Sequence, residues 1–376
     1  MIDWGSVRKE FPITENYIYF NHAGVSPLSN RVVKAVEDYL GIISKHGIVK
    51  EACRQFIETT ADTRSKIARL INAEVDEIAF VKNTTQGILI AANGVDWREG
   101  DNVVTAGVEF PANIYPWLNL ERRGVKTRFV QEKEARIPVE GIEEMIDHRT
   151  RVVSISFVEF ASGFRNDLEA IGQICHEKGI LFVVDGIQGL GALDIDVKKC
   201  RIHAMSSDGH KWLLGPEGIG CFYCSKEILD KLTLNNVGWN SVINESAYLD
   251  YDLTLRPDAQ RFEEGSLNIM GIYALEAAVE FILEIGIQNI ETRLLKLTGL
   301  MIEKLKEKGY RIVSSLIPEE RSGIVCFRSQ THSSAELCHL LTENKVIVSD
   351  RAESVRLSPH FYNSEEEIEQ MIGILP

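Results

Sequence analysis

The sequence predicts an α/β protein with a mostly parallel central sheet and a smaller α+β region at its C-terminal end. Short β-rich runs alternate with helical patterns through the middle of the chain, which is typical of parallel strands joined by crossover helices. After about Asn268 a long helical pattern replaces this alternation. The chain has 376 residues, 44% hydrophobic and 26% charged, which suits a globular protein with a large core.

The first elements can be placed in chain order. Residues 1–30 are expected to form an extended arm, and Leu168–Lys178 has the amphipathic period of a helix. The run Gly218–Tyr223 follows the strand before it too closely for a crossover helix, so we expect it to run antiparallel. Parallel strands are expected at Asn102–Thr105, Thr127–Val130, Val152–Phe157, Ile180–Val184 and His203–Ser206.

The C-terminal region is expected to form a smaller domain. A helical pattern covers about Ile272 to Lys308, and Ser364–Glu367 is a capping box that opens a last helix. Strands are expected near Tyr310–Ser314, Gly323–Arg328 and Ser354–Ser358. We therefore expect an N-terminal arm over 1–30, a large domain over 31–268 and a small domain over 269–376.

Charge and cysteine content exclude several classes of protein. The net charge is −14, which argues against nucleic acid as a partner because phosphate binding needs clustered Lys and Arg. The chain has seven cysteines, and an odd number in a large chain suits a reducing compartment better than a disulfide framework. There is no signal-peptide core and no long apolar run. We expect a cytoplasmic protein that binds neither nucleic acid nor membrane.

The motifs for metals and nucleotides are missing. Cys221 and Cys224 form a CxxC pair, but residues three apart on a strand point to opposite faces. No second pair stands at zinc spacing, and no Gly-rich phosphate loop follows a strand. The sequence therefore predicts no metal site and no nucleotide fold.

Two segments that follow strands are candidates for binding a ligand. Asp185 ends an apolar run, with Gln188 three residues later, and ligands of open parallel sheets bind at the carboxyl ends of strands. Asp185 is alternatively the cap of a following helix. Asn83, Thr84 and Thr85 open a helical pattern, and a helix N-terminus with hydroxyls suits a phosphate. The alternative is simple N-capping.

Three further residues have side chains suited to chemistry. Lys211 lies beside His210 among apolar residues, and partial burial would lower its pKa and free the amine for Schiff-base formation. Phe110 follows a strand and is placed either to stack on a flat ring or to join the core. Arg356 lies between apolar neighbours, where it either meets a ligand carboxylate or makes an internal salt bridge.

Taken together, these segments resemble the class V aminotransferase group of fold-type-I, pyridoxal-phosphate (PLP) enzymes. The branch is the one that contains isopenicillin N epimerase, selenocysteine lyase, cysteine desulfurase and kynureninase, and the likeness spans nearly the whole chain. Six segments carry it in the family's order: Tyr19–Gly24 as the opening arm, Asn83–Thr85 as the phosphate turn, Asp185 with Gln188, Asp208–Lys211 as the lysine motif, Arg261–Ser266, and Arg356 followed by Tyr362 and Asn363.

The resemblance implies a role for each candidate residue. Lys211 would form the Schiff base with PLP, and Asp185 would keep the pyridine nitrogen protonated. Arg356 would bind the substrate carboxylate, with Asn21 as a further substrate contact. It also implies a homodimer with shared active sites. The remaining cofactor contacts would be Gln188 on the ring hydroxyl, Phe110 on the ring face, Thr84, Thr85 and His210 on the phosphate, and Ser266 on the phosphate of the partner subunit.

The chain departs from the cysteine desulfurases at several positions. They carry a catalytic cysteine on a loop before the substrate arginine, whereas residues 345–355 are short and contain none. Phe110 stands at the position where the desulfurases have a His. Phe160 stands at the position where they have an Asn that contacts the cofactor ring. Asp208 replaces a Ser near the phosphate, and we expect its carboxylate to point away. We therefore predict that the chain is not a working cysteine desulfurase.

The resemblance implies a PLP-dependent enzyme that acts on an amino acid, and a transaminase is the function we expect. An amino-acid epimerase and a β-lyase of the selenocysteine-lyase kind are alternatives of the same fold, since all begin by removing the Cα proton. A catalytically silent PLP-fold binding protein is the remaining alternative.

Overall fold

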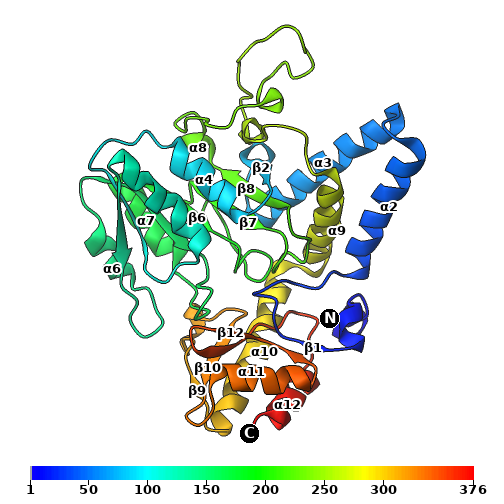
Figure 1. Ribbon diagram of the computed structural model, residues 1–376, viewed down its shortest axis with the longest axis vertical. Coiled ribbons are helices and arrows are strands. Elements are labelled where there is room, and N and C mark those ends of the chain that lie inside the picture. Colours follow the sequence, from blue (N-terminus) through cyan, green and yellow to red (C-terminus); the bar gives the residue numbers. More distant parts are fainter. Residues whose placement is uncertain (1) are drawn as a thin grey trace.

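A computed structural model describes residues 2–376, and a seven-stranded sheet lies at its centre (Figure 1). All five predicted parallel strands are present. The strand at Gly220–Cys224 pairs antiparallel with its predecessor, as expected. In spatial order the strands are β2 (Ile78–Val81), β8 (Gly220–Cys224), β7 (Ala204–Asp208), β6 (Leu181–Asp185), β5 (Thr150–Ser156), β3 (Asn102–Ala106) and β4 (Lys126–Val130).

Both faces of this sheet are covered by helices. Alternate side chains of a strand enter different cores, so Phe182 and Val184 pack on one face and Val183 on the other. The first face is covered by α3 (Lys50–Ile71), α6 (Val139–Met145), α7 (Leu168–Lys178) and α9 (Ile269–Ile285). The second is covered by α4 (Thr84–Gly94), α5 (Tyr115–Leu118) and α8 (Lys226–Leu229). Helix α2 (Asn30–His46) packs on α9.

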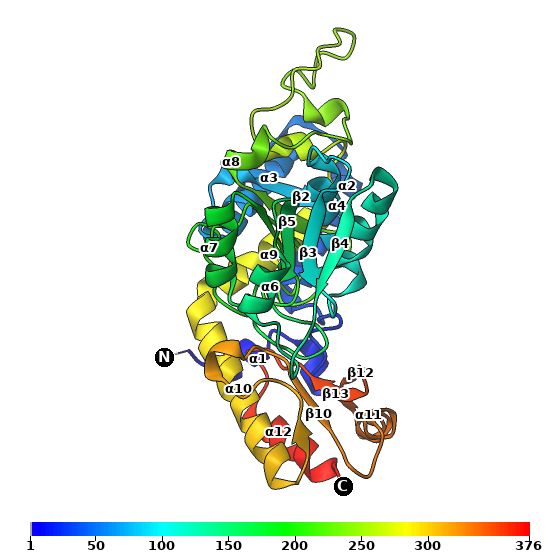
Figure 2. The same cartoon turned by 90° about the vertical axis from the view of Figure 1, so that its left-hand side faces the viewer.

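A four-stranded antiparallel sheet forms the C-terminal part of the fold (Figure 2). The expected long helix is interrupted, because Gly286 adopts a φ of 87° that ends α9 and starts α10 (Ile287–Glu307). The capping box is present, with Ser364 as N-cap. The elements are β12 (Ser349–Arg351), β13 (Ser354–Leu357), β10 (Val325–Arg328), β9 (Arg311–Ile312), α11 (Ser334–Glu343) and α12 (Glu365–Ile374).

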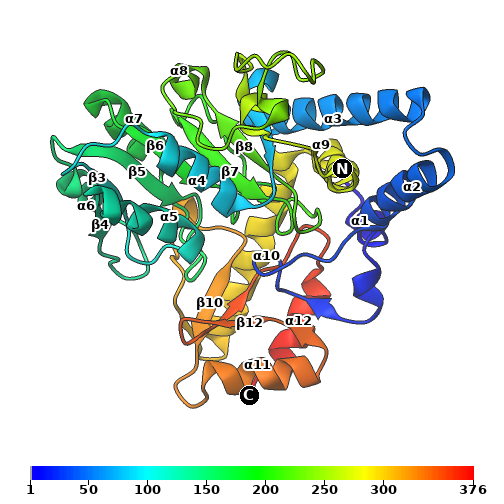
Figure 3. The same cartoon turned by 45° about the horizontal axis from the view of Figure 1, so that its top comes forward.

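The N-terminal residues pack against this C-terminal part (Figure 3). The expectation of a purely extended arm was wrong, since α1 (Trp4–Arg8) is capped by the Asp3 side chain. The two-residue strand β1 (Ile18–Tyr19) pairs in parallel with β11 (Val346–Ile347). Phe11 stacks on Tyr362 with ring centroids 3.8 Å apart. The start of the chain is thereby fixed close to the residues that follow Arg356.

None of the helices within residues 2–376 combines the length and the apolar character needed to cross a membrane.

Candidate active site

A cavity of about 310 Å³ opens where the carboxyl ends of the large sheet's parallel strands face the C-terminal sheet. It collects every site residue predicted from the sequence except Asn21 and Ser266. Polar and aromatic side chains from distant parts of the chain therefore meet in one place. Its lining includes Gly24, Asn83, Thr84, Thr85, Phe110, Phe160, Asp185, Gln188, Asp208, His210, Lys211, Arg351 and Arg356.

The N-terminus of α4 forms one end of the cavity. Asn83 caps the helix, its side-chain oxygen accepting from the Gln86 N–H at 3.0 Å, so the capping interpretation is correct for this residue. Thr84 is buried, and its Oγ1 accepts from the Asp208 N–H at 3.0 Å. Thr85 is half-buried at the cavity wall. The free N–H groups of the helix and the Thr85 hydroxyl suit an anion such as a phosphate.

The Asp208 carboxylate is held by its own loop. Its Oδ1 accepts from the Gly209 N–H at 2.7 Å, and its Oδ2 lies 3.1 Å from His210 Nδ1. Because the Nδ1 side of the His210 ring faces Asp208, the ring can offer its Nε2 side to a ligand. The Asp208 carboxylate is thus held by its own loop, and its orientation away from a bound phosphate stays a prediction.

Asp185 lies at the end of β6 with one oxygen free. Its side chain is 1% exposed, and its Oδ1 accepts from the Ile187 N–H at 3.0 Å. Its Oδ2 is buried and has no hydrogen-bond partner among residues 2–376. Burial raises the pKa of Asp185 to about 6, against the effects of that N–H and of Lys211. No α-helix follows before β7, so Asp185 does not cap one. The free oxygen fits a protonated ring nitrogen.

Two more buried carboxyl groups lie beside Asp185, and the sequence analysis did not single them out. Glu109 accepts from the backbone N–H of Ser156 at 2.6 Å, and Ser156 is the β5 residue in register with Asp185. Burial raises the pKa of Glu109 to about 7, and it raises that of Glu159 well above the ordinary value. The only sequence signal was the position of Glu109 after a strand, next to Phe110.

Lys211 is buried, in agreement with its position among apolar residues in the sequence. It is 8% exposed, and its Nζ lies 5.5 Å from the centroid of the Phe110 ring. Burial lowers the pKa of Lys211 to about 8, although the Asp185 charge opposes the shift. A sizeable fraction of its amine is therefore neutral near pH 7 to 8, as attack on an aldehyde requires.

The loop that carries Lys211 is held from three directions. The Ser26 hydroxyl donates to the Lys211 carbonyl at 2.6 Å. Trp212 donates from Nε1 to the Gln188 side-chain oxygen at 3.0 Å, and its carbonyl lies 3.1 Å from His360 Nε2. Gln188 also donates to the Ala23 carbonyl at 3.0 Å. The Gln188 amide thus joins the arm to the lysine loop, with one N–H left for a ligand.

Phe110 is not a core residue, since it is 42% exposed at the cavity mouth. Its ring meets that of Phe160 edge to face, with centroids 5.2 Å apart. The two rings form an apolar wall beside Lys211, and the ring of Phe110 is open to stacking by a flat ligand.

Arg356 enters the cavity from β13. It is 1% exposed, and it donates to the Phe160 carbonyl at 2.8 Å and to Ser349 Oγ at 3.1 Å. Burial lowers its pKa to about 10. Within residues 2–376 no carboxylate forms an ion pair with it, which contradicts the internal salt-bridge alternative. A buried guanidinium without a counter-charge is suited to a ligand carboxylate.

Two predicted residues lie outside the cavity. Asn21 packs against Gly24, so closely that a Cβ on Gly24 would come within 2.8 Å of the Asn21 side chain. Ser266 is exposed and does not reach the cavity of its own chain. The resemblance implies that Ser266 acts in a partner subunit, and this role stays a proposal.

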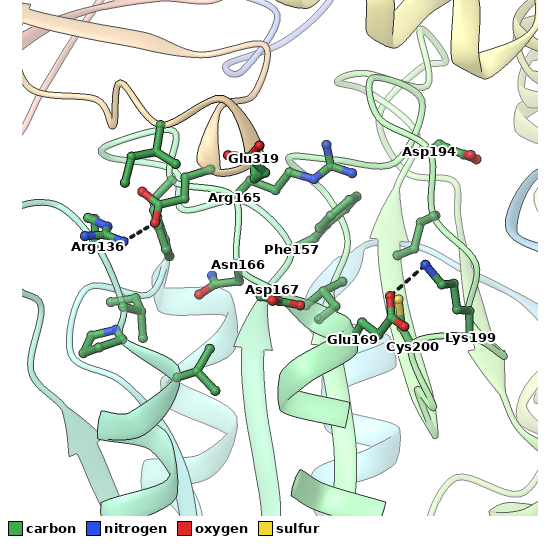
Figure 4. Close-up of a pocket in the computed structure, with 18 of the residues that line it drawn as sticks. Arg136, Phe157, Arg165, Asn166, Asp167, Glu169, Asp194, Lys199, Cys200 and Glu319 are labelled. Atoms are coloured by element: carbon green, nitrogen blue, oxygen red, sulfur yellow. Dashed lines mark hydrogen bonds and ion pairs between the residues drawn. The ribbon is translucent and has the colours of Figure 1, made fainter. Parts of the chain in front are cut away.

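A larger cavity, of about 870 Å³, lies elsewhere and contains none of the predicted residues (Figure 4). Its basic side chains other than Lys133 pair with acidic ones. Lys199 lies 2.7 Å from Glu169, Arg165 lies 2.6 Å from Glu291, and Arg136 pairs with Glu320. Size alone therefore does not identify the site.

Cysteine is missing from the lining of the smaller cavity. Cys326 is in register with Arg356 across the C-terminal sheet, but it is fully buried and its Sγ donates to the Ala161 carbonyl at 3.2 Å. Burial raises its pKa to about 12, so it holds little thiolate at neutral pH.

Comparisons with known proteins agree with this arrangement. A model of the aminotransferase class-V family matches residues 18–371. A probable cysteine desulfurase of Methanothermobacter thermautotrophicus is 32% identical over 98% of this chain and 96% of its own. The apo structure of a cysteine desulfurase from Thermococcus onnurineus NA1 is 27% identical, with a TM-score of 0.91 over 100% of this chain and 97% of that one.

A further structure is similar in fold. It is a C-DES variant with glycine covalently linked to its PLP cofactor, 22% identical, with a TM-score of 0.92 over 99% of this chain and 98% of that one. The expected fold class, a fold-type-I arrangement with a mostly parallel central sheet, is confirmed. The orphaned Asp185 oxygen, the buried Lys211 amine and the α4 N-terminus fit PLP.

Proposed function

Because the chain belongs to the class-V aminotransferase family of PLP-dependent enzymes, we propose that it cleaves the bond between Cβ and sulfur in an amino acid, without a cysteine of its own. The observation that carries the proposal is the composition of the cavity. It holds a lysine, an acid with a free oxygen and an unpaired arginine, but no cysteine. The names of relatives support the choice of bond, since cysteine desulfurases act on a carbon–sulfur bond.

Lys211, Asp185 and the α4 N-terminus would hold the cofactor. When bound, PLP withdraws electrons from the substrate Cα. Lys211 would attach the cofactor, and its amine, when free, would take the Cα proton. The free Oδ2 of Asp185 would accept the ring N–H, and Thr85 and His210, which line the cavity, would hold the phosphate beside the helix N-terminus.

Arg356 would bind the substrate α-carboxylate. Its Nε and Nη1 are already oriented by Ser349 and the Phe160 carbonyl, so the guanidinium is fixed before substrate arrives. A fixed fork favours a bidentate bond with a carboxylate and places Cα over the Lys211 amine. This role requires the substrate to be an amino acid and not a simple amine.

The sulfur would leave without passing through a protein persulfide. A persulfide relay needs an accessible thiolate, and the cavity lining offers none. Where the desulfurases carry their cysteine loop, this chain has the tight hairpin β12–β13. We therefore propose that sulfur departs with the leaving group, as sulfide from cysteine and as cysteine persulfide from cystine.

Transamination is the second candidate, and the name of the matching family favours it. It uses the same Lys211 proton transfer and the same Arg356 contact. The difference lies in the fate of the amino group, which stays on the cofactor in transamination and leaves as ammonia after β-elimination.

Product analysis with a panel of amino acids separates these reactions. We expect the holoenzyme to yield pyruvate, ammonia and sulfide from cysteine, and pyruvate, ammonia and cysteine persulfide from cystine. A keto acid with an aminated cofactor and no sulfide would instead establish transamination. Alanine together with a persulfide on one cysteine would overturn the proposal, and loss of optical activity without other products would indicate an epimerase.

We also propose a homodimer whose subunits share their active sites. The segment 237–253 projects from the body of the chain in Figures 1 and 2. Tyr248, Leu249 and Tyr251 are 75%, 90% and 91% exposed, which is unusual unless a partner covers them. A monomer in light scattering that still binds PLP tightly would refute this proposal.

The seven cysteines favour a reducing compartment, and we propose the cytoplasm. All of them are free thiols in the structure. Fractionation of cells that express the tagged protein would test this location.

A further inference from the structure

The hairpin β12–β13 places a second arginine at the active-site cavity. Ser349 is in register with Arg356, and Arg351 with Ser354. Side chains two residues apart on a strand share a face, as do cross-strand partners, so Ser349, Arg351 and Arg356 all lie on one face. Arg351 is the diagonal neighbour of Arg356, at a spacing of about 7–8 Å between backbones. Both side chains line the cavity that holds Lys211.

The turn of this hairpin fixes the orientation of Arg351. Ala352 and Glu353 both have positive φ, of 47° and 58°, as in a two-residue turn whose twist matches that of the strands. The next strand residue, Asp350, points to the opposite face, where its carboxylate accepts from Ser334 Oγ at 3.0 Å. The neighbouring acid therefore does not neutralise Arg351.

Arg351 has no counter-charge of its own. Its Nη1 donates to the Asp350 carbonyl at 2.8 Å, and within residues 2–376 no carboxylate pairs with Arg351. The positive charge of Arg351 also affects Arg356. Burial is the main reason that the pKa of Arg356 falls to about 10, and the positive charge of Arg351 contributes to this shift. The guanidinium groups of Arg351 and Arg356, neither of which is paired with a carboxylate, thus face the same cavity.

We infer that the substrate carries a second anionic group on a short side chain, and that Arg351 binds it. This rests on the proposed function, in which Arg356 holds the α-carboxylate. The proposed function assigns the cavity donors Lys211, His210 and Thr85 to the cofactor. The rings of Phe110 and Phe160 line the same cavity and offer no hydrogen bond to a side chain, so we assign the second anion to Arg351. A carboxylate and a sulfur oxyanion such as a sulfinate share this chemistry. Arg351 is exposed, so it selects between substrates at the mouth of the cavity.

The test compares ligands with one and two anionic groups. Succinate and butyrate differ in one carboxylate and need no reaction, so calorimetry on the holoenzyme at low salt reports the pocket alone. We expect succinate to bind about tenfold more tightly, in line with one hydrogen-bonded charge pair. The Arg351→Gln variant should lose this preference, and Arg351→Lys should keep only part of it.

A matched control removes a charge elsewhere on the same sheet. Arg311 lies on β9 at the far edge of the C-terminal sheet, and it is exposed. Arg311→Gln should keep the preference for succinate. Equal binding of the two ligands by the unmodified protein, an unchanged preference in Arg351→Gln, or loss of preference in Arg311→Gln would each overturn the inference.

A comparison of amino acids then shows whether the second anionic group is a carboxylate or a sulfur oxyanion. L-aspartate and L-cysteine sulfinate are compared with L-alanine through the absorbance of the bound cofactor. Tighter binding of the sulfinate than of aspartate indicates a sulfur oxyanion, and the reverse indicates a carboxylate. If no amino acid changes the cofactor spectrum while succinate keeps its preference, the proposed function fails and the two-anion pocket remains.

Discussion

The two walls of the active-site cavity carry ionisable groups of opposite kind, and among residues 2–376 neither Asp185 nor Arg356 has an ion-pair partner. On the large sheet, Asp185 has a buried oxygen without a partner, and Glu109 and Glu159 lie close to it. On the C-terminal sheet, Arg356 and Arg351 have no carboxylate among residues 2–376. In the larger cavity, by contrast, three of the four basic side chains are paired with carboxylates.

This difference shows how each wall is suited to a separate ligand. The acidic wall, formed by Asp185 with Glu109 and Glu159, suits a protonated ring nitrogen. A protonated nitrogen allows the cofactor ring to accept electrons. The basic wall, formed by Arg356 and Arg351, suits the carboxylate of a substrate. Lys211 lies between them, where burial lowers its pKa and Asp185 limits the shift. Unpaired buried charge is costly to folding, so its presence on both walls indicates a functional site.

The largest effect is expected at Lys211, which joins the two walls. Lys211→Ala should lower turnover by about 10³-fold or more, because it removes both the attachment point and the proton-moving amine. Borohydride reduction and peptide mapping of the unmodified protein should place the label on Lys211. Lys226→Ala removes an exposed lysine paired with Asp76 and should change neither result. Label on another lysine would contradict the assignment.

Breaking the acidic wall should reduce turnover while the cofactor stays bound. Asp185→Asn should lower kcat on the order of 10²-fold, because the amide does not stabilise a protonated ring nitrogen. Cofactor content per subunit and kcat are measured together. Asp194→Asn, in the larger cavity, is the control. A variant with unchanged kcat would remove Asp185 from this role.

Breaking the basic wall should act on substrate binding. Arg356→Ala should cost about 2–5 kcal/mol in kcat/KM, the usual range for breaking a desolvated charge pair. Arg356→Lys should raise KM and leave the cofactor spectrum unchanged, because lysine does not copy the fork of arginine. If Tm fell instead while KM stayed constant, Arg356 would be a structural residue.

The pH dependence of cofactor attachment reports on the balance between the walls. Only the neutral Lys211 amine attacks the aldehyde, so the rate should rise with pH and level off above pH 8. Below that point it should fall about tenfold for each pH unit. The midpoint should lie near the lowered pKa of about 8, not near the ordinary 10.5. Mixing apoenzyme with PLP across this pH range and following absorbance gives the midpoint.

The smallest effect is expected at Cys326, which lies beneath the basic wall. Its thiol is buried and its pKa is raised to about 12, so Cys326→Ser should leave sulfide and pyruvate formation nearly unchanged. Persulfide detection on the intact protein after reaction with cysteine provides the second measurement. A persulfide on any single cysteine, lost together with activity in its serine variant, would contradict the proposed route.

Much of the fold was predictable because its signals are local. The apolar run before Asp185 and the Asn83 cap each depend on a few neighbouring residues, and both appear as predicted. The break at Gly286 was missed because a glycine inside an amphipathic pattern does not reveal its φ. The short helix at Trp4–Arg8 was missed because five residues give no clear period.

The sequence by itself determined which chemical groups this protein has and the order in which they occur. Lys211, Asp185 and Arg356 were recognisable from their motifs. Only the tertiary structure decided how these groups affect one another. It buried Lys211 beside Asp185, left Arg356 without a carboxylate, and turned Arg351 into the same cavity. The reason is that pKa and charge pairing depend on which distant segments pack together, whereas periodicity and capping depend on neighbours in the chain.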